Sequence, residues 1–81
     1  MIIEKLLPQQ DWTLIVWTDD GRKGIFDVRP YLHYEAFEKL NSADEFVKIF
    51  NGRYFVEWEC GADLSADTIE ERMRLTGDDV S

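Results

Sequence analysis

The residues best suited to chemistry are four carboxylates, two on each side of a glycine: Glu57, Glu59, Asp63 and Asp67. Such a group could hold a hard cation or form a general acid/base pair. The spacing argues against both roles. Calcium loops of the EF-hand type need oxygen ligands at alternate positions and a final bidentate glutamate, whereas Leu64 and Ala66 interrupt this stretch. We interpret Glu57 and Glu59 as the solvent face of a strand, and Asp67 as an acid in the first turn of a helix.

Cysteine and histidine, the other reactive residue types, occur once each. Cys60 has no second cysteine for a disulfide or a zinc motif, which fits a reducing compartment, and we interpret it as a small buried residue beside Trp58. His33, a lone histidine between Leu32 and Tyr34, is interpreted as structural or exposed. The sequence contains no nucleophile elbow, phosphate-binding loop, dinucleotide-binding glycine pattern or zinc-protease motif. We therefore expect no enzymatic activity and no cofactor.

The charge of the chain disfavours nucleic acid as a direct ligand. The formal net charge is -8, and residues 41–81 hold ten acidic residues against four basic ones. Binding to a phosphate backbone needs clustered lysine and arginine, which this distribution does not offer. An acidic surface suits a basic protein partner, and it also keeps a small domain soluble. No apolar run approaches the roughly 18 residues that span a bilayer. Residues 1–5 lack a signal-peptide pattern, so we predict a cytoplasmic protein without membrane contact.

The first half of the chain reads as strands followed by short helical segments. We expect one domain over residues 1–77 with a flexible acidic tail at 78–81, a strand at 2–7 ending at Pro8, and a central strand at 12–18. Asp20-Gly21 favours a two-residue hairpin loop that pairs Asp19 with Arg22. That register predicts a core face made of Ile15, Trp17, Phe26 and Val28.

A short helical segment over residues 35–40 should bury Phe37 and Leu40, and Ser42 with Glu45 has the pattern of a capping box. Further core residues are expected from Phe46, Ile49 and Phe50. Asn51-Gly52 predicts a second hairpin, followed by a strand at 53–59. One face of this strand is predicted to enter the core, with Tyr54, Val56, Trp58 and Cys60.

The second half contains the turn that connects the last predicted strand to the last predicted helix; we call residues 58–65 the joint. We expect Trp58 to anchor the last strand, Gly61 to turn the chain and Ser65 to cap a helix over residues 66–74. This helix is expected to bury Ile69 and Met73 on one side and to pair Glu70 with Arg74. Gly77 is expected to end it. The predicted fold is α+β: a small antiparallel sheet built from two hairpins plus an N-terminal strand, with a short middle helical segment and a C-terminal helix.

Several of these residues match a known family pattern. They are Trp17-Thr18-Asp19-Asp20-Gly21 leading to Phe26-Asp27-Val28, then Phe37-Glu38-Lys39-Leu40, Phe46, and Trp58 with Gly61-Ala62-Asp63-Leu64-Ser65 and Asp67-Thr68-Ile69. With them the chain resembles the domain of unknown function 2442 family. Glu59 and Cys60 stand where that family usually has proline and asparagine, and Ala66 stands where it has proline.

The resemblance implies an α+β fold and a bacterial, cytoplasmic setting, and it supplies no catalytic residues. Relatives occur alone, fused to helix-turn-helix modules, or beside another small protein in toxin-antitoxin-like pairs. No helix-turn-helix segment follows Ser81, so the DNA-binding role of the fused relatives is not expected here.

The sequence favours a non-enzymatic interaction domain, such as the regulatory or antitoxin-like half of a two-protein module. The expected contact surface is aromatic: Trp12, Tyr31, Tyr34 and Phe55. The expected partner is a protein, with a basic protein favoured by charge; a homodimer through an edge strand is the simplest variant. The alternative is a small-ligand or metal-binding protein that uses the acids around Asp63. Whether the aromatic residues are buried in the monomer or at an interface stays open at this point.

Overall fold

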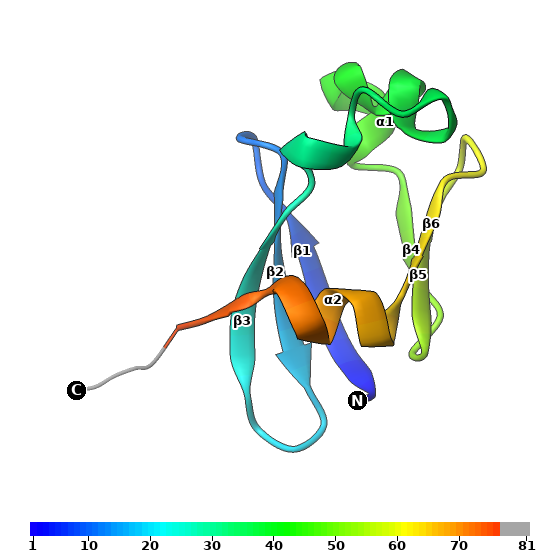
Figure 1. The fold of residues 1–81 in the computed structure, drawn as a ribbon. Coiled ribbons are helices and arrows are strands. Elements are labelled where there is room, and N and C mark those ends of the chain that lie inside the picture. Colours follow the sequence, from blue (N-terminus) through cyan, green and yellow to red (C-terminus); the bar gives the residue numbers. More distant parts are fainter. Residues whose placement is uncertain (77–81) are drawn as a thin grey trace.

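The computed structural model describes residues 1–76 and contains two antiparallel sheets that face one another (Figure 1). The first sheet has the order β1-β2-β3-β7, with β1 Ile3–Pro8, β2 Thr13–Thr18, β3 Lys23–Asp27 and β7 Arg74–Leu75. The second has the order β4-β5-β6, with β4 Ile49–Asn51, β5 Phe55–Trp58 and β6 Asp63–Ser65. The predicted α+β class is confirmed, although the strands divide between two sheets where one was expected.

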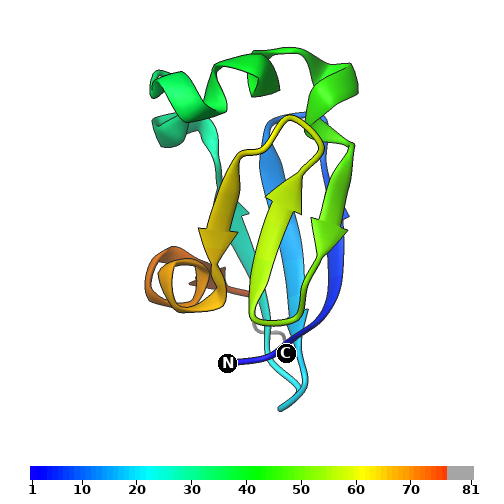
Figure 2. The ribbon, with the colours of Figure 1, turned by 90° about the vertical axis from the view of Figure 1, so that its right-hand side faces the viewer.

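Helical segments close the ends and sides of this two-sheet arrangement. The chain between β3 and β4 forms η1 (Arg29–Tyr31), η2 (Glu35–Asn41) and α1 (Ala43–Phe46), which lie together at the top of Figure 1. Helix α2 (Ala66–Arg72) connects the second sheet to β7 of the first, and lies to one side of the sheets in Figure 2. The predicted tail and the predicted stop at Gly77 fall outside the described residues.

The core fills the space between the sheets. Its most buried side chains come from both sheets and from the helical segments: Ile3, Leu14, Val16, Phe26, Val28, Leu40, Phe46, Val56, Trp58 and Ile69. Trp58 is the largest of them, and its indole N–H donates a hydrogen bond of 2.9 Å to the carbonyl oxygen of Phe46. Trp58 therefore anchors β5 in the core, as predicted.

The register of the β2–β3 hairpin differs from the prediction by one residue. Leu14 lies opposite Phe26, and Ile15 lies opposite Ile25. The amide of Thr18 donates to the carbonyl of Arg22, so the loop has three residues and ends at Gly21, whose φ is 88°. The predicted two-residue loop is wrong.

This shift exchanges the side chains of β2 that face the core with those that face outward. Leu14 and Val16 enter the core beside Phe26, whereas the expected core residues Ile15 and Trp17 are half-buried on the outer side of the sheet. Both faces of this strand are apolar, so the side-chain pattern alone does not fix the register.

The second hairpin turns two residues later than expected. Asn51 still belongs to β4 and pairs with Val56. The amide of Tyr54 donates to the carbonyl of Gly52 at 2.8 Å, and the intervening Arg53 has a φ of 74°, which makes this a γ-turn. The side-chain oxygen of Asn51 accepts from the amide of Arg53 at 2.8 Å and so supports the later turn.

The later turn also exposes two aromatic side chains. Phe50 and Tyr54, both expected in the core, are 62% and 67% exposed. Ile49 and Cys60 are only half-buried.

The predicted joint from Trp58 to Ser65 is confirmed at its glycine and at its cap. Gly61 has a φ of 102° and closes a second three-residue loop, in which the amide of Trp58 donates to the carbonyl of Ala62 at 2.8 Å. The strand β6 that follows was not predicted. Ser65 is the N-cap of α2, where its Oγ accepts from the amide of Thr68 at 3.1 Å.

Helix α2 ends at Arg72, two residues before the predicted end, because Arg74 pairs with Ile25 as part of β7. Met73 is buried as expected, although it lies beyond the helix. Ser42 precedes α1 as predicted, but its side chain makes no capping hydrogen bond.

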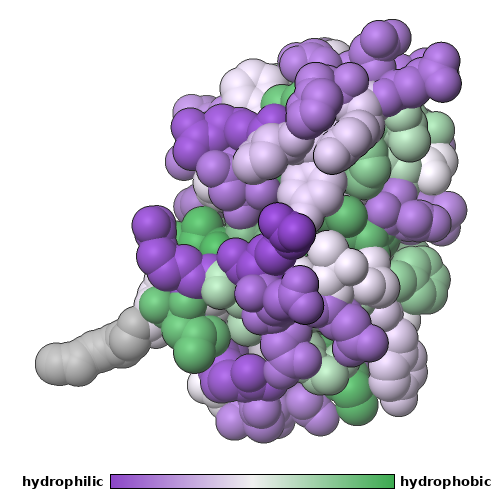
Figure 3. Space-filling model, viewed as in Figure 1, coloured by the Kyte–Doolittle hydropathy of each residue, from purple (hydrophilic) through white to green (hydrophobic). Residues whose placement is uncertain are grey.

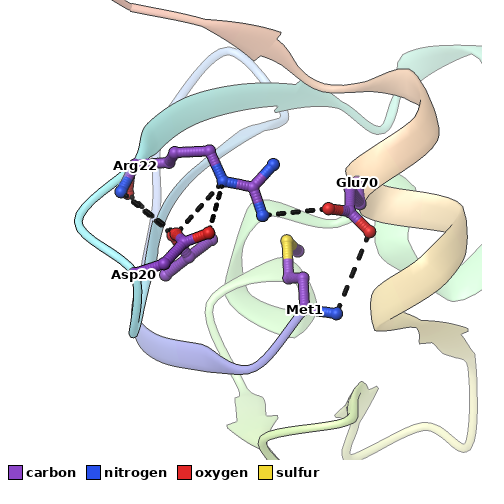
Figure 4. A network of polar contacts seen from close by, with 5 residues as sticks. Met1, Asp20, Arg22 and Glu70 are labelled. Carbon is purple, nitrogen blue, oxygen red and sulfur yellow. Dashed lines mark hydrogen bonds and ion pairs between the residues drawn. The ribbon is translucent and has the colours of Figure 1, made fainter.

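Arg22 links the β2–β3 loop to α2 (Figure 4). Its Nε lies 2.9 Å from Oδ2 of Asp20, and its Nη2 lies 2.9 Å from Oε2 of Glu70. The predicted Glu70–Arg74 pair is wrong, because Glu70 points to Arg22 and lies 3.9 Å from the Met1 ammonium. Hydrogen bonds from Thr18 and Arg22 lower the pKa of Asp20 to about 2.

Candidate functional site

Two of the four predicted contact residues are packed into the helical end of the domain. The indole N–H of Trp12 donates to the carbonyl oxygen of Leu40 at 2.6 Å. The ring of Tyr31 packs against Phe26 and Phe37, with centroids 5.7 Å apart in each pair. Both Trp12 and Tyr31 are half-buried, so they support the structure more than they offer contact area.

The other two predicted contact residues are exposed but lie on different parts of the domain. Tyr34 is 53% exposed in the helical end, beside His33, with ring centroids 4.3 Å apart. Phe55 is 39% exposed and begins β5, just after the turn at the other end of the second sheet (Figure 1). The structure thus keeps Tyr31 and Tyr34 together, with ring centroids 6.2 Å apart, but places Phe55 away from them on a sheet face.

The outer side of the second sheet gathers aromatic and acidic side chains that the sequence did not bring together. Phe50 of β4 lies opposite Glu57 of β5, and Glu57 lies opposite Asp63 of β6. Because side chains alternate along a strand, Phe55 points to the same side as Glu57. Glu59 lies in the loop after β5 and lines one cavity with Phe50 and Glu57. We call this surface the acidic-aromatic face; it comprises Val47, Phe50, Phe55, Glu57, Glu59 and Asp63. Figure 2 looks onto this side of the sheet.

A hollow of about 560 Å³ lies on this face. Its lining includes the exposed apolar side chains of Val47 and Phe50 and the carboxylates of Glu57 and Glu59. Lys48 is also in the lining, with its Nζ 3.3 Å from Oε2 of Glu45 and 3.9 Å from Oε1 of Glu59. The hydrogen bond to Glu45 raises the pKa of Lys48.

The charge of the acidic-aromatic face is only partly compensated. Within residues 1–76, Glu57 and Asp63 have no cationic group within 4 Å, and Asp63 is exposed. The face therefore offers negative charge beside apolar area. The alternation of residues 53–59 could identify Phe55, Glu57 and Glu59 as its members, whereas Phe50 needs the register of the hairpin.

The predicted acidic group does not assemble into a metal centre in the described part of the chain. Glu57 and Asp63 are neighbours across two strands, whereas Glu59 lies in a loop and Asp67 lies on α2. No three histidine, cysteine, aspartate or glutamate side chains of residues 1–76 come together as metal ligands. The metal or small-ligand alternative stays a prediction.

The rest of the visible surface is neither uniformly hydrophobic nor uniformly hydrophilic. On the side shown in Figure 3, hydrophobic residues form separate patches between hydrophilic ones. Among the helices of residues 1–76, none has the length and apolar composition needed to cross a bilayer.

Comparison with known proteins places the chain in one family. The family model described as "Protein of unknown function (DUF2442)" matches residues 3–74. No curated protein and no solved structure matches the chain. The family match runs from the first residue of β1 to the first residue of β7, so it includes both sheets and the joint at Gly61. The chain therefore belongs to the DUF2442 family.

Proposed function

We propose that this protein is a non-enzymatic interaction domain of the bacterial cytoplasm that docks a basic protein partner, as the regulatory or antitoxin-like half of a two-protein module. The observation that supports this proposal is the acidic-aromatic face. It places two exposed phenylalanine rings beside three carboxylates on one side of a sheet, and no element among residues 1–76 covers it.

The two kinds of side chain on this face have different roles in binding. Phe50 and Phe55 supply large apolar area, and phenylalanine is among the residues that are enriched in the buried centres of interfaces. Glu57, Glu59 and Asp63 attract a positively charged surface and set its orientation. A partner that fits therefore carries lysine or arginine around apolar pockets.

A second copy of this chain is a poorer occupant of the acidic-aromatic face. In a twofold dimer the same patch meets itself, so the carboxylates of both copies would approach one another. We expect the sedimentation coefficient of the purified protein to stay the same at two widely different concentrations. Concentration-dependent dimerisation that Glu57→Lys abolishes would contradict this assignment of the partner.

The proposal is tested by locating the partner's contact and then measuring affinity. p-Benzoylphenylalanine in place of Phe50 should crosslink a basic protein in the native host. With that protein purified, Phe50→Ser should weaken binding roughly 30-fold, the effect of losing about 2 kcal/mol at an interface hot spot. Glu57→Lys should also weaken binding, and added salt should weaken it further.

Two variants at the helical end serve as matched controls. Tyr34→Ser removes an aromatic ring that is 53% exposed, and Glu38→Lys inverts an exposed charge on η2. Both should bind like the wild type. If Phe50→Ser and Glu57→Lys leave affinity unchanged, or if the crosslinked partner is acidic, the proposal is wrong.

A further inference from the structure

Three arginines line one cavity of about 330 Å³ on the outer side of the first sheet, away from the acidic-aromatic face. Arg29 follows β3, Arg72 ends α2 and Arg74 begins β7. They meet because β7 pairs with β3, which places Arg74 opposite Ile25. We call this cavity the arginine pocket; its lining includes Asp11, Thr13, Ile25, Asp27, Arg29, Arg72 and Arg74.

The two acidic residues of the pocket already accept hydrogen bonds from neighbouring side chains. Asp27 accepts two side-chain hydrogen bonds from Arg29, each of 2.9 Å, and these bonds lower the pKa of Asp27. Asp11, also in the lining, accepts a hydrogen bond from the hydroxyl of Thr13. Among residues 1–76, neither Arg72 nor Arg74 has a carboxylate within 4 Å.

Two guanidinium groups with no carboxylate within 4 Å thus line this cavity together with Asp11 and Asp27, and the charge of Arg74 also acts on Asp27. Guanidinium is planar and carries its donors in a fork that matches the oxygens of a carboxylate or a phosphate. An oxyanion in the cavity would also reduce the repulsion between these like charges.

The pocket adjoins an apolar row of the first sheet. Ile25 in its lining lies opposite Ile15 of β2, and Ile15 lies opposite Leu7 of β1. All three point to the outer side of the sheet, and Leu7 is 46% exposed. A ligand with its anionic group at Arg72 and Arg74 would therefore lay an attached apolar group along this row.

The same face disfavours a stacked nucleobase. The Nζ atoms of Lys5 and Lys23 lie 5.0 and 5.5 Å from the centroid of the Trp17 ring, so lysine side chains occupy the aromatic surface that a base would need. The rest of the row is aliphatic.

We propose that the arginine pocket binds an oxyanion, a carboxylate or a phosphate, carried by a molecule whose apolar part lies along Ile25, Ile15 and Leu7. This site is separate from the acidic-aromatic face and does not depend on the proposed function.

The test is a titration of the full chain, followed through backbone amide signals in nitrogen-15 NMR spectra, with acetate, hexanoate and inorganic phosphate as probes. At least one probe should give saturable shifts at Thr13, Ile25 and Arg74. Hexanoate should bind about tenfold more tightly than acetate, because it adds four methylene groups that a half-exposed row buries only in part. Tighter binding of acetate than of phosphate identifies a carboxylate ligand, and the reverse order identifies a phosphate ligand.

Variants separate specific binding from general charge effects. Arg72→Gln and Arg74→Gln should each weaken binding at least fivefold, and Ile15→Ser should remove the preference for hexanoate over acetate. Arg53→Gln, at an exposed arginine in the β4–β5 turn, is the matched control and should change nothing. The dispersion of the same spectra verifies that each variant is folded.

The proposal is overturned if no probe gives saturable shifts in the pocket, or if Arg53→Gln weakens binding as much as Arg74→Gln. Equal affinities for acetate and hexanoate would overturn the role of the apolar row.

Discussion

Replacing Gly61 with alanine should lower the free energy of unfolding by about 1 kcal/mol, through the backbone alone. Gly61 has a φ of 102°, and a Cβ built there would have no atom within 4 Å apart from those of its two chain neighbours, so no clash with the rest of the fold contributes. A left-handed backbone costs an alanine about 1–2 kcal/mol. Alanine also lowers the conformational entropy of the unfolded chain, which favours the folded state by about 0.4–1 kcal/mol. The difference leaves a net loss of about 1 kcal/mol.

Urea unfolding followed by tryptophan fluorescence is the suitable assay, because Trp58 is fully buried and its indole emission reports on the core. The unfolding midpoint should fall while the slope with denaturant stays constant. Gly21→Ala should cost a similar amount, since Gly21 has a φ of 88° and equally open surroundings. Glu59→Ala, in the same loop as Gly61 but at a negative φ, is the control and should stay within about 0.5 kcal/mol of the wild type. A midpoint for Gly61→Ala equal to that of the wild type would refute the reasoning.

Three further predictions concern the cap, the core and acid stability. Ser65→Ala should cost about 1 kcal/mol, because the amide of Thr68 loses its acceptor; thermal unfolding that matches the wild type would show that the cap adds nothing. Trp58→Phe should cost about 2–4 kcal/mol, because it leaves the buried carbonyl of Phe46 unpaired and a gap in the core, which urea unfolding followed by circular dichroism would measure. Because the pKa of Asp20 falls from 3.8 to about 2 on folding, its contribution is present above pH 4 and is lost as the pH falls through 2. Asp20→Asn should therefore flatten the stability profile between pH 4 and pH 2, and an unchanged profile would contradict the pKa shift.

The part of the fold that could be predicted from the sequence is the part with strong local signals. Ser65 has a side chain that caps a helix, and Gly61 occupies a backbone conformation that other residues rarely adopt. Phe37 and Leu40 have helical spacing in a short segment and are both buried. Each of these signals depends on a few neighbouring residues, and each is confirmed.

Register could not be predicted in the same way, because it depends on loop length. In β2 both faces are apolar, so a two-residue and a three-residue loop give equally hydrophobic core faces. The three-residue loop is supported by Thr18, whose hydroxyl accepts from the amide of Arg22 at 3.0 Å. The one-residue shift moved Ile15 and Trp17 to the outer side of the sheet and Leu14 and Val16 to the inner side.

The candidate site was predicted only in part for a related reason. Trp12 and Tyr31 have the composition of an interface, yet their burial depends on helical segments that cover them. Phe50 could be placed on the acidic-aromatic face only once its partner across the strands, Glu57, was known. The short strands β6 and β7 carry too few residues for an alternating pattern, and tertiary pairing determines them.

The position of β1 has a consequence for how the chain folds. The amide of Ile3 donates to the carbonyl of Arg53 at 2.8 Å, and the side-chain amide of Asn51 donates to the carbonyl of Ile3 at 3.1 Å. These contacts join residues about 50 positions apart in the sequence, and such distant contacts slow folding because large loops must close first. During synthesis, the first strand emerges from the ribosome long before β4 and β7 are available. The first sheet and the core therefore stay incomplete until β7 has been made.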